Sequence, residues 1–486
     1  MEERKTIYLC LAHMSEAGLE QKYVKEAFDT NWVVPMGPNV NAFEEDLRKF
    51  VTGNVESAVY QDSRWPEATA AAWKLNPALK DTTVVCLSAG TAAVHLALIG
   101  CGVKAGDEVC VQSFTFCASS HPITYLGAKP VFIGSEKDTW NMDPELLEKA
   151  IIDRKEKTGR YPKAIVPVAL YGMPYDCERI MAIADKYGIP VVEDAAEGMG
   201  SRFNGQVLGT FGKYGVLSFN GNKMITTSGG GALICRSKEE ANEVMWYATQ
   251  ARDAYPYYQH TAIGYNYRMS NVCAGIGRGQ MTVLDDHIEH HKHVQRLYKE
   301  LLKDVPGVHL HEAPLMPYEN ENNNENPKYD SNFWLCAATI DADVHVKGQE
   351  NVYKEVIKTA VGGAAGVIHA VDSATTDCQP NDNVEALRVF MLAKKVECRP
   401  LWKPMHCQPV YNEGSYENDN ENTSTSSAQA DNGNVGCRVI EDPKMACYTN
   451  RVEEELFKVG FCLPAGPYVT DDDVRYIVEC IKEAIS

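Results

Sequence analysis

The feature that most restricts the fold of this chain is a run of alternating short apolar segments and helix-like segments between residues 83 and 236. This alternation predicts βαβ units, and therefore a mostly parallel sheet with helices on both faces. Ligands of such sheets bind beyond the carboxyl ends of the strands, where Gly90, Tyr171 and Asp194 are expected. The predicted strands are 83–87, 108–112, 131–133, 164–168 and 190–193, and the predicted helices are 91–100, 144–156 and 177–187.

A chain of 486 residues exceeds the size of a single hydrophobic core, so two domains are expected. We assign residues 1–285 to a large domain and 286–486 to a smaller α/β domain, connected through a long helix over 271–304. Two polar inserts, near 319–330 and at 412–436, contain almost no large apolar side chains. We expect both to be exposed loops, the second one near the mouth of the active site.

The formal net charge of −19 argues against a nucleic-acid-binding surface. No apolar run approaches the length that crosses a bilayer, so no membrane partner is expected. The 16 cysteines include no Cys-x-x-Cys pair, and many lie in apolar stretches. Reduced, buried cysteines in a cytoplasmic enzyme are the simplest interpretation.

The pair Asp194 and Lys223 has the pattern that pyridoxal phosphate (PLP) chemistry needs. Asp194 ends a predicted strand, and Lys223 follows on a glycine-rich loop. A lysine there forms a Schiff base with the aldehyde, and the aspartate keeps the pyridinium nitrogen protonated so that the ring acts as an electron sink. Taken singly, a surface lysine and a helix-capping aspartate are about as common.

The stretch 88–93, Ser-Ala-Gly-Thr-Ala-Ala, ends a predicted strand and opens a helix. Free N–H groups at a helix N-terminus bind phosphate well, and Thr91 adds a hydroxyl donor. Ser218 lies five residues before Lys223 and could place its hydroxyl on the same anion. Alone, an ordinary strand–helix turn would also explain this stretch.

Several stretches, in this order and spacing, resemble the PLP-dependent sugar-nucleotide aminotransferases of the DegT type, which have the aspartate aminotransferase fold (fold type I). The closest resemblance is to the UDP-4-keto-sugar C4 aminotransferases of the UDP-N-acetylbacillosamine pathway. It covers the chain from about residue 15 to the C-terminus, apart from the inserts and part of 340–385. The stretches are 88–93, 114–116, 193–197, 218–231, 249–252, 264–271 and 399–406.

The resemblance implies a cofactor role for each of eight positions. Lys223 is the Schiff-base lysine and the acid/base, and Asp194 pairs with the pyridinium nitrogen. Phe116 stacks on the cofactor ring. Asn266 reaches the phosphate from a neighbouring subunit, which makes the active site a property of a homodimer. The phosphate ligands within the subunit are Gly90, Thr91 and Ser218, and the eighth residue is Glu197.

Glu197 stands where many family members have glutamine, near the phenolic oxygen of PLP. A carboxylate beside a phenolate is repulsive unless one of them is protonated or a donor intervenes. Members of the bacillosamine type resemble this chain in having glutamate there.

Four further residues are implied to contact the substrate: Tyr171, Arg399, Trp402 and His406. Each also has an ordinary structural interpretation. Tyr171 could be a buried ring with a bonded hydroxyl, and Arg399 a surface ion pair. His406 could be a structural histidine, Trp402 could fill the small domain, and Phe116 could be core packing.

Four histidines lie in the predicted connecting helix: His287, His290, His291 and His293. The first three could share a helix face, as metal ligands do. The segment is charged throughout and shows no outer-shell partners. We therefore interpret it as a solvated face and expect no metal.

The resulting expectation is a cytoplasmic, homodimeric aminotransferase with PLP as its cofactor. It takes an amino group from an amino acid, with glutamate favoured, and delivers it to the C4 keto group of a nucleotide-linked 4-keto-6-deoxy sugar, with UDP favoured, for surface glycans. Three alternatives stay open: a PLP-dependent sugar dehydratase, another fold-type-I enzyme such as a lyase or desulfurase, and a non-enzymatic scaffold.

Overall fold

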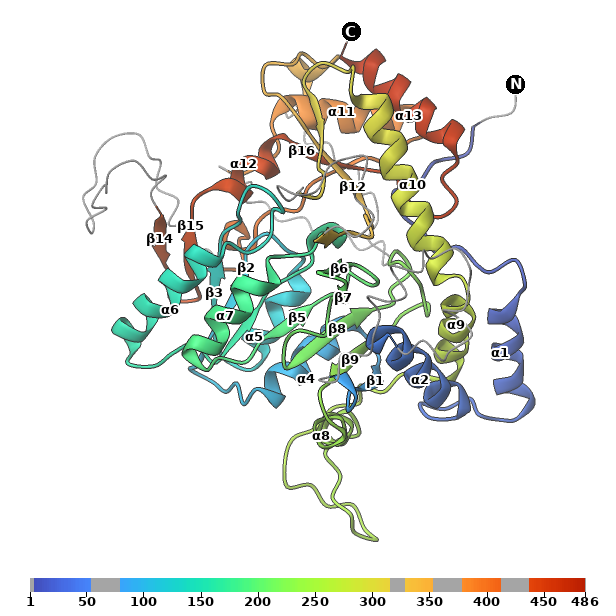
Figure 1. The fold of residues 1–486 in the computed structure, drawn as a ribbon, viewed down its shortest axis with the longest axis vertical. Helices are drawn as coiled ribbons and strands as arrows, with labels where there is room; N and C mark the ends of the chain where they lie inside the picture. The colour runs from blue at the N-terminus through green and yellow to red at the C-terminus, as the bar shows by residue number, and fades with distance from the viewer. Residues whose placement is uncertain (1–3, 54–78, 315–327, 353–377, 412–436, 486) are drawn as a thin grey trace.

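The computed structural model describes residues 4–53, 79–314, 328–352, 378–411 and 437–485. The predicted insert 412–436 lies outside these residues, as does nearly all of 319–330, so the expectation of exposed loops stays a prediction. The described chain forms a large central sheet between helices and a smaller antiparallel sheet beside it (Figure 1).

The central sheet consists of two hydrogen-bonded sheets that join through bridges between Ile165 and Val191 and between Val168 and Asp194. Two of its described strands, β9 and β14, are antiparallel to the others, so the predicted mostly parallel sheet is confirmed. The strand order is β14 (Arg438–Glu441), β15 (Ala446–Thr449), β3 (Lys129–Ile133), β2 (Glu108–Gln112), β4 (Ala164–Val166), β5 (Val192–Asp194), β8 (Tyr214–Ser218), β9 (Gly231–Cys235) and β1 (Thr83–Leu87).

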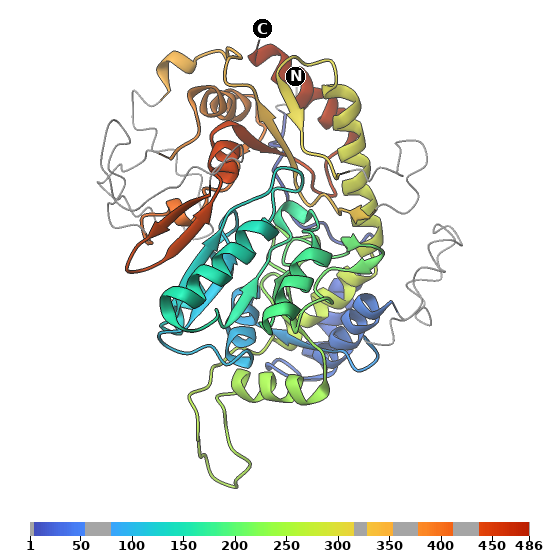
Figure 2. The same ribbon diagram turned by 60° about the vertical axis from the view of Figure 1, so that its left-hand side comes forward.

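Helices cover both faces of this sheet, as predicted (Figure 2). Successive side chains of a strand point to opposite faces. Val84 and Cys86 accordingly belong to one apolar core, while Val85 and Leu87 belong to another. The first core includes α2 (Pro38–Thr52), α6 (Pro144–Thr158) and α7 (Cys177–Tyr187), and the second includes α4 (Gly90–Gly100), α5 (His121–Tyr125) and α8 (Lys238–Ala248).

Local sequence signals set the ends of two of these helices. Asp143 accepts hydrogen bonds from the first N–H groups of α6, and Asp176 does so for α7. Gly159 and Gly188 then end the same helices with positive φ angles, which glycine adopts without a steric penalty.

The smaller sheet contains only antiparallel pairs among its described strands, in the order β10 (Val308–Leu310), β12 (Cys336–Ile340), β16 (Gly460–Leu463) and β13 (Arg399–Pro400). Its apolar core is shared with α10 (Leu284–Leu302), α11 (Asp382–Ala393) and α13 (Asp471–Ala484). The other described elements are α1 (Leu19–Asp29), α9 (Asn271–Met281), β6 (Arg202–Phe203), β7 (Gln206–Val207), β11 (Tyr329–Asp330) and α12 (Val452–Val459).

The structure differs from the sequence expectation around the connecting helix. The expected single helix over 271–304 is two helices, α9 and α10, with a break between them. The interpretation of its histidines as a solvated face is wrong for His287 and His291, which are buried. His287 Nδ1 lies 3.2 Å from the carbonyl oxygen of Met224, and His291 Nδ1 lies 3.2 Å from that of Phe333.

The domain boundary after residue 285 stays a prediction, with one structural detail that bears on it. The hairpin of β14 and β15 falls within 286–486, yet β15 pairs in parallel with β3 of the central sheet. The C-terminal third of the chain therefore returns to the large sheet before it forms α12 and β16.

Candidate active site

The carboxyl ends of β5 and β8 bring the predicted site residues together. These strands are parallel neighbours, with Asp194 opposite Val216. Asp194 is the last residue of β5 and Ser218 the last residue of β8, so both lie at the same edge of the sheet. Lys223 follows five residues after β8, in a turn where its N–H donates to the Asn220 carbonyl, at 2.9 Å.

Asp194 is a buried carboxylate held by two donors. The Ser119 hydroxyl donates to Oδ2 at 2.6 Å, and the Ala196 N–H donates to Oδ1 at 3.2 Å. Burial raises the pKa of Asp194, and these donors together with the nearby Lys223 only partly offset that effect. A carboxylate has about four acceptor positions, so Asp194 can still accept from a further donor.

The Lys223 ammonium is fixed by a carboxylate and by an aromatic face. Its Nζ lies 3.1 Å from Glu197 Oε1 and 4.2 Å from the ring centroid of Trp334. The Trp334 indole N–H donates to the Asn222 carbonyl at 2.7 Å, which ties the ring to the lysine turn. The Lys223 side chain is 12% exposed, so it reaches solvent only through a narrow opening.

Glu197 is a buried acid whose charge state is sensitive near neutral pH. Burial raises the pKa of Glu197 to about 7, although Lys223 and the N–H of Tyr171 act in the opposite direction. That N–H donates to Oε2 at 2.8 Å. A carboxylate at position 197 would repel the phenolate of PLP unless one of them is protonated or a hydrogen-bond donor lies between them. The Lys223 Nζ lies beside Glu197 and can be that donor.

An aromatic cluster lies next to this pair. The Trp402 ring centroid lies 5.2 Å from that of Tyr171, 5.5 Å from that of Phe116 and 6.2 Å from that of Trp334. The backbone N–H of Trp402 donates a hydrogen bond to the Tyr171 hydroxyl at 2.9 Å. Phe116 packs against Trp402 and is still 54% exposed, so part of its ring is open to a ligand.

The predicted phosphate ligands meet at the start of α4. A Cβ added to Gly90 would lie 3.0 Å from the Ser218 Cβ and 3.2 Å from its hydroxyl oxygen. A side chain at position 90 would therefore fill the space above Ser218. Gly90 and Thr91 are the first two residues of α4, whose described N-terminus has no side-chain cap, so its N–H groups can bind an anion.

These residues fit PLP on three observations of the structure. Asp194 has spare acceptor capacity in a buried position, which suits a ring N–H. Lys223 is held by Glu197 and is close enough to influence the pKa of Asp194. The space between Gly90 and Ser218, where the phosphate would bind, is open because residue 90 has no side chain. Gly90, Thr91, Ser218, Asp194 and Lys223 are therefore the residues that would hold the cofactor.

All four predicted substrate residues have protein partners, and those of Arg399 and His406 lie outside the aromatic cluster. Arg399 is exposed and donates twice to Glu397 Oε1, at 2.9 and 2.6 Å. His406 is fully buried, and its Nδ1 lies 2.6 Å from the Ser113 hydroxyl. Tyr171 and Trp402 line the aromatic cluster beside Lys223, whereas the structure does not place Arg399 or His406 against that lysine.

Asn266 lies apart from the residues just described. It is exposed, and it lines a hollow of about 460 Å³ together with Met36, Thr249 and Arg252. This hollow has neither Lys223 nor Asp194 in its wall. Within one chain, Asn266 therefore does not join the cofactor cradle.

The sequence argument missed two residues that position the site. Ser119 holds Asp194, and it follows the Phe114-Thr115-Phe116 stretch by only three residues, so a scan for hydroxyl donors after that stretch could have found it. Trp334 contacts Lys223 from a distant part of the sequence. No local sequence signal indicates such a contact.

Comparisons with known proteins identify the class. The DegT/DnrJ/EryC1/StrS aminotransferase family matches residues 66–361, and the chain belongs to this family. It is 36% identical to a "Putative pyridoxal phosphate-dependent aminotransferase EpsN" from Bacillus subtilis over 98% of this chain and 95% of that protein. It is 28% identical to the GDP-perosamine synthase of Escherichia coli O157:H7 over 99% of both chains.

The fold agrees with this assignment. A crystal structure of a DegT DnrJ EryC1 StrS aminotransferase from Brucella abortus matches with a TM-score of 0.69 at 22% identity, over 97% of this chain and 96% of that one. The chain is thus a PLP-dependent aminotransferase of nucleotide sugars with the predicted fold type I architecture. Among the described helices, none combines the length and apolar character needed to cross a bilayer.

Proposed function

We propose that the chain transfers an amino group from glutamate to the C4 keto group of a UDP-linked 4-keto-6-deoxy sugar, for surface-glycan synthesis. The observation that carries the proposal is the arrangement of Asp194, Glu197 and Lys223 at one edge of the sheet, with Nζ of Lys223 3.1 Å from Glu197. The resemblance of 218–231, 249–252 and 399–406 to C4 aminotransferases supports the sugar position and the nucleotide.

Bound PLP supplies an electrophilic carbon for amines and a ring that accepts electrons from the substrate carbon. Asp194 would bind the ring nitrogen, and burial keeps solvent from competing for its carboxylate. The α4 N-terminus and Ser218 would bind the phosphate, and Phe116 would contact the ring. These contacts position the cofactor relative to Lys223.

Lys223 holds and moves the proton. Its charge lowers the pKa of the Asp194 carboxylate, against the larger effect of burial, and Glu197 Oε1 lies 3.1 Å from its Nζ. Because the pKa of Glu197 is raised to about 7, Glu197 can accept or donate a proton at neutral pH with little free-energy cost. We assign Glu197 the task of setting the protonation state of the lysine between proton transfers.

The sugar nucleotide occupies the aromatic side of the site. The partly buried Trp402 ring lies beside the lysine site, and the buried Tyr171 ring packs behind it, with the two ring centroids 5.2 Å apart; an indole face suits the apolar face of a 6-deoxy sugar. Arg399 is an exposed guanidinium held in place by Glu397, and it would attract the diphosphate. His406 does not contact the sugar in this proposal. It supports the segment 399–406 from its buried side through the contact with the Ser113 hydroxyl.

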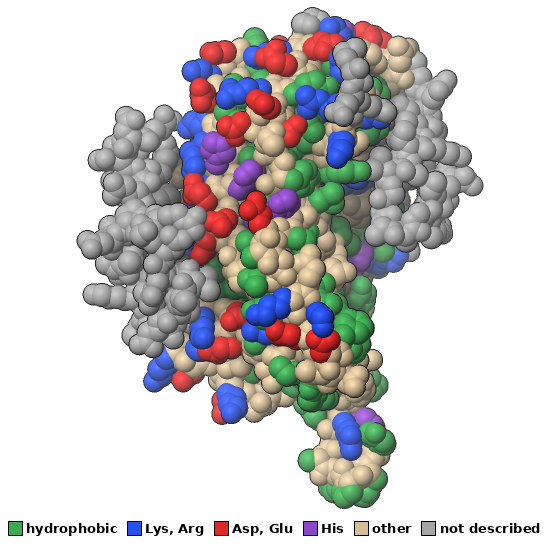
Figure 3. Space-filling view, turned by 90° about the vertical axis from the view of Figure 1, so that its right-hand side faces the viewer, with side chains coloured by type: hydrophobic (Ala, Val, Ile, Leu, Met, Phe, Trp, Pro, Cys, Tyr) green, Lys and Arg blue, Asp and Glu red, His purple; other side chains and the backbone are tan. Residues whose placement is uncertain are grey.

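A homodimer with shared sites would bring Asn266 to a partner's cofactor. The hollow that Asn266 lines also includes Met36 and Tyr255, which belong to a group of exposed apolar side chains, and the segment after α8 extends away from the body of the chain (Figures 1 and 3). Exposed apolar clusters of this kind mark interaction surfaces. The exposed side chains are Phe28, Trp32, Val33, Val34, Met36, Tyr255, Tyr257, Tyr258 and Ile263.

Incubation with keto sugars tests the proposal directly. The purified enzyme with PLP and glutamate is given UDP-, GDP- and dTDP-4-keto-6-deoxy sugars and a UDP-3-keto sugar, and the products are analysed by mass spectrometry and by NMR for the aminated carbon. We expect amination at C4 of the UDP sugar, together with formation of 2-oxoglutarate. Preference for the GDP sugar or for C3 would contradict the assigned substrate, and a dehydrated product without an amine would contradict transamination.

A further inference from the structure

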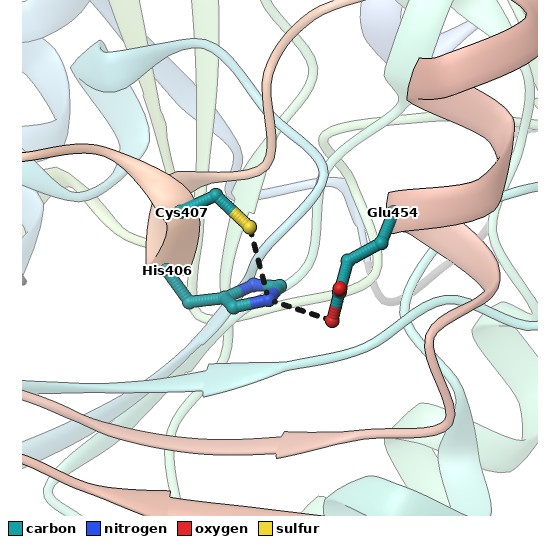
Figure 4. A group of neighbouring side chains, drawn as sticks. All are labelled: His406, Cys407 and Glu454. Carbon is teal, nitrogen blue, oxygen red and sulfur yellow. Dashed lines mark hydrogen bonds and ion pairs between the residues drawn. The ribbon is translucent and has the colours of Figure 1, made fainter. Parts of the chain in front are cut away.

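A second cluster of reactive side chains lies at the end of the segment 399–406, which carries the predicted substrate residues Arg399, Trp402 and His406. His406 and Cys407 belong to one short 3₁₀ turn, Met405–Cys407, and Glu454 lies in the first turn of α12 (Figure 4). His406 and Cys407 are buried, and the Glu454 side chain is 13% exposed. The described structure gives this cluster no part in the PLP site.

The three side chains converge on a single point. His406 Nε2 lies 3.2 Å from Glu454 Oε1 and 3.3 Å from Cys407 Sγ. The three candidate donor atoms all lie within 4.8 Å of one another. Zinc bonds of about 2.0 Å to nitrogen and oxygen and about 2.3 Å to sulfur place tetrahedral ligands roughly 3.2–3.6 Å apart. The two distances at Nε2 match the edges of such a tetrahedron.

The other ring nitrogen of His406 has the partner that a metal-bound histidine normally has. The Ser113 hydroxyl lies 2.6 Å from Nδ1, and Glu453 Oε1 lies 3.9 Å from it. With Nδ1–H directed at Ser113, the Nε2 lone pair faces Glu454 and Cys407. Outer-shell contacts of this kind fix the ring orientation at metal sites.

Without a metal, a hydrogen on Nε2 serves Glu454, and the Cys407 thiol keeps its own proton. If Nε2 is unprotonated, its lone pair faces a carboxylate oxygen at 3.2 Å. A divalent cation at the centre would satisfy the nitrogen, the carboxylate and a thiolate at once.

We propose that His406 Nε2, Cys407 Sγ and Glu454 bind one zinc ion. Binding replaces the Cys407 thiol proton, which leaves to solvent, so the site carries a His–thiolate–carboxylate donor set typical of zinc. A fourth position remains, and Cys378 lies in the same buried cluster as Cys407 and Phe457. The proposal requires the three named ligands and is independent of the substrate proposed above.

The ion would connect three parts of the fold. Ser113 follows β2 directly, and its carbonyl accepts from the Met405 N–H at 2.8 Å. The segment 399–411 carries Trp402, and α12 carries Glu454. Zinc would therefore fasten the segment that carries Trp402 to the sheet edge and to α12, which stabilises the fold and the aromatic side of the site.

The test uses the full-length enzyme with PLP, purified under reducing conditions and freed of metal by a chelator. Zinc is then titrated with a chromophoric chelator as competitor, and cobalt is used as an absorbing substitute. We expect one zinc per chain, a thiolate-to-cobalt charge-transfer band, and a higher melting temperature with zinc. No stoichiometric binding, or binding without the thiolate band, would overturn the proposal.

Variants locate the ion. Cys407→Ser and Glu454→Gln should each weaken zinc binding by about 100-fold or more, since even an outer-shell change costs about 10–100-fold. Ser113→Ala should weaken it by about tenfold. Cys273→Ser, a partly buried cysteine in α9, serves as the matched control and should leave the affinity unchanged. Circular dichroism verifies folding of each variant; equal affinity in all folded variants would place the zinc elsewhere and refute the site.

Discussion

Glu197 Oε1 and Lys223 Nζ form a buried ion pair, 3.1 Å apart, in which the acid has its pKa raised to about 7. The position matters because Glu197 is a buried group whose pKa lies near neutral pH, next to the lysine proposed to bind the cofactor. Exchange of Glu197 for glutamine therefore separates the effect of its charge from that of its shape.

The first prediction concerns Glu197→Gln and pH. Because burial raises the folded-state pKa from 4.5 to about 7, the folded protein binds this proton more tightly than the unfolded chain does. The resulting contribution to stability is complete below pH 4.5 and is lost as pH rises through about 7. The melting temperature of Glu197→Gln relative to wild type, in protein stripped of PLP, should rise between pH 4.5 and 7.5. A constant difference would contradict the raised pKa.

Asp194 and Ser119 should have unequal effects on turnover. Asp194→Asn removes the group that favours a protonated ring nitrogen, so we expect a loss of kcat by orders of magnitude with the fold retained. Ser119→Ala removes one hydrogen bond to a charged group and should lower kcat about tenfold. Asp185→Asn, at an exposed position of α7, is the matched control. An Asp194→Asn enzyme within a few-fold of wild type would disprove the role of this aspartate.

Mixing of two inactive variants tests the shared site. If Asn266 serves the partner's cofactor, a heterodimer of Lys223→Ala and Asn266→Ala subunits contains one site free of both changes. Random exchange should then restore about a quarter of wild-type activity. Subunit exchange is verified with differently tagged chains. Exchange without recovery would show that each chain builds its own site.

The Tyr171 hydroxyl should affect substrate binding more than the chemical step. Tyr171→Phe removes the acceptor of the Trp402 N–H and loosens the segment that carries Trp402. We expect a rise in KM for the nucleotide sugar of about two- to tenfold with kcat nearly unchanged. Tyr187→Phe, whose hydroxyl contacts Glu148, is the control. A fall in kcat at constant KM would instead place this hydroxyl in the chemistry.

The bounds of the strands and helices around the site could be predicted closely. Buried parallel strands are short, nearly continuous apolar runs, and turn residues separate them in the sequence. β1, β2 and α7 have the predicted bounds. Gly90, Tyr171 and Asp194 could be placed at strand ends for the same reason, whereas no strand before Ser218 is predicted from the sequence, and the structure has β8 there. Contacts across the chain could not be predicted, such as Trp334 on Lys223, because hydrophobic periodicity indicates which side is buried but not against what. The charged composition of α10 similarly concealed that His287 and His291 face the core.

The central claim is that Lys223 is the lysine to which PLP is attached. The enzyme is incubated with PLP, reduced with borohydride and digested, and the modified peptide is sequenced by mass spectrometry. We predict stoichiometric modification of the peptide that contains Lys223, and none in the Lys223→Ala variant, while the exposed-lysine control Lys238→Ala is modified like wild type. Modification at another lysine, or none in wild type, would contradict the account.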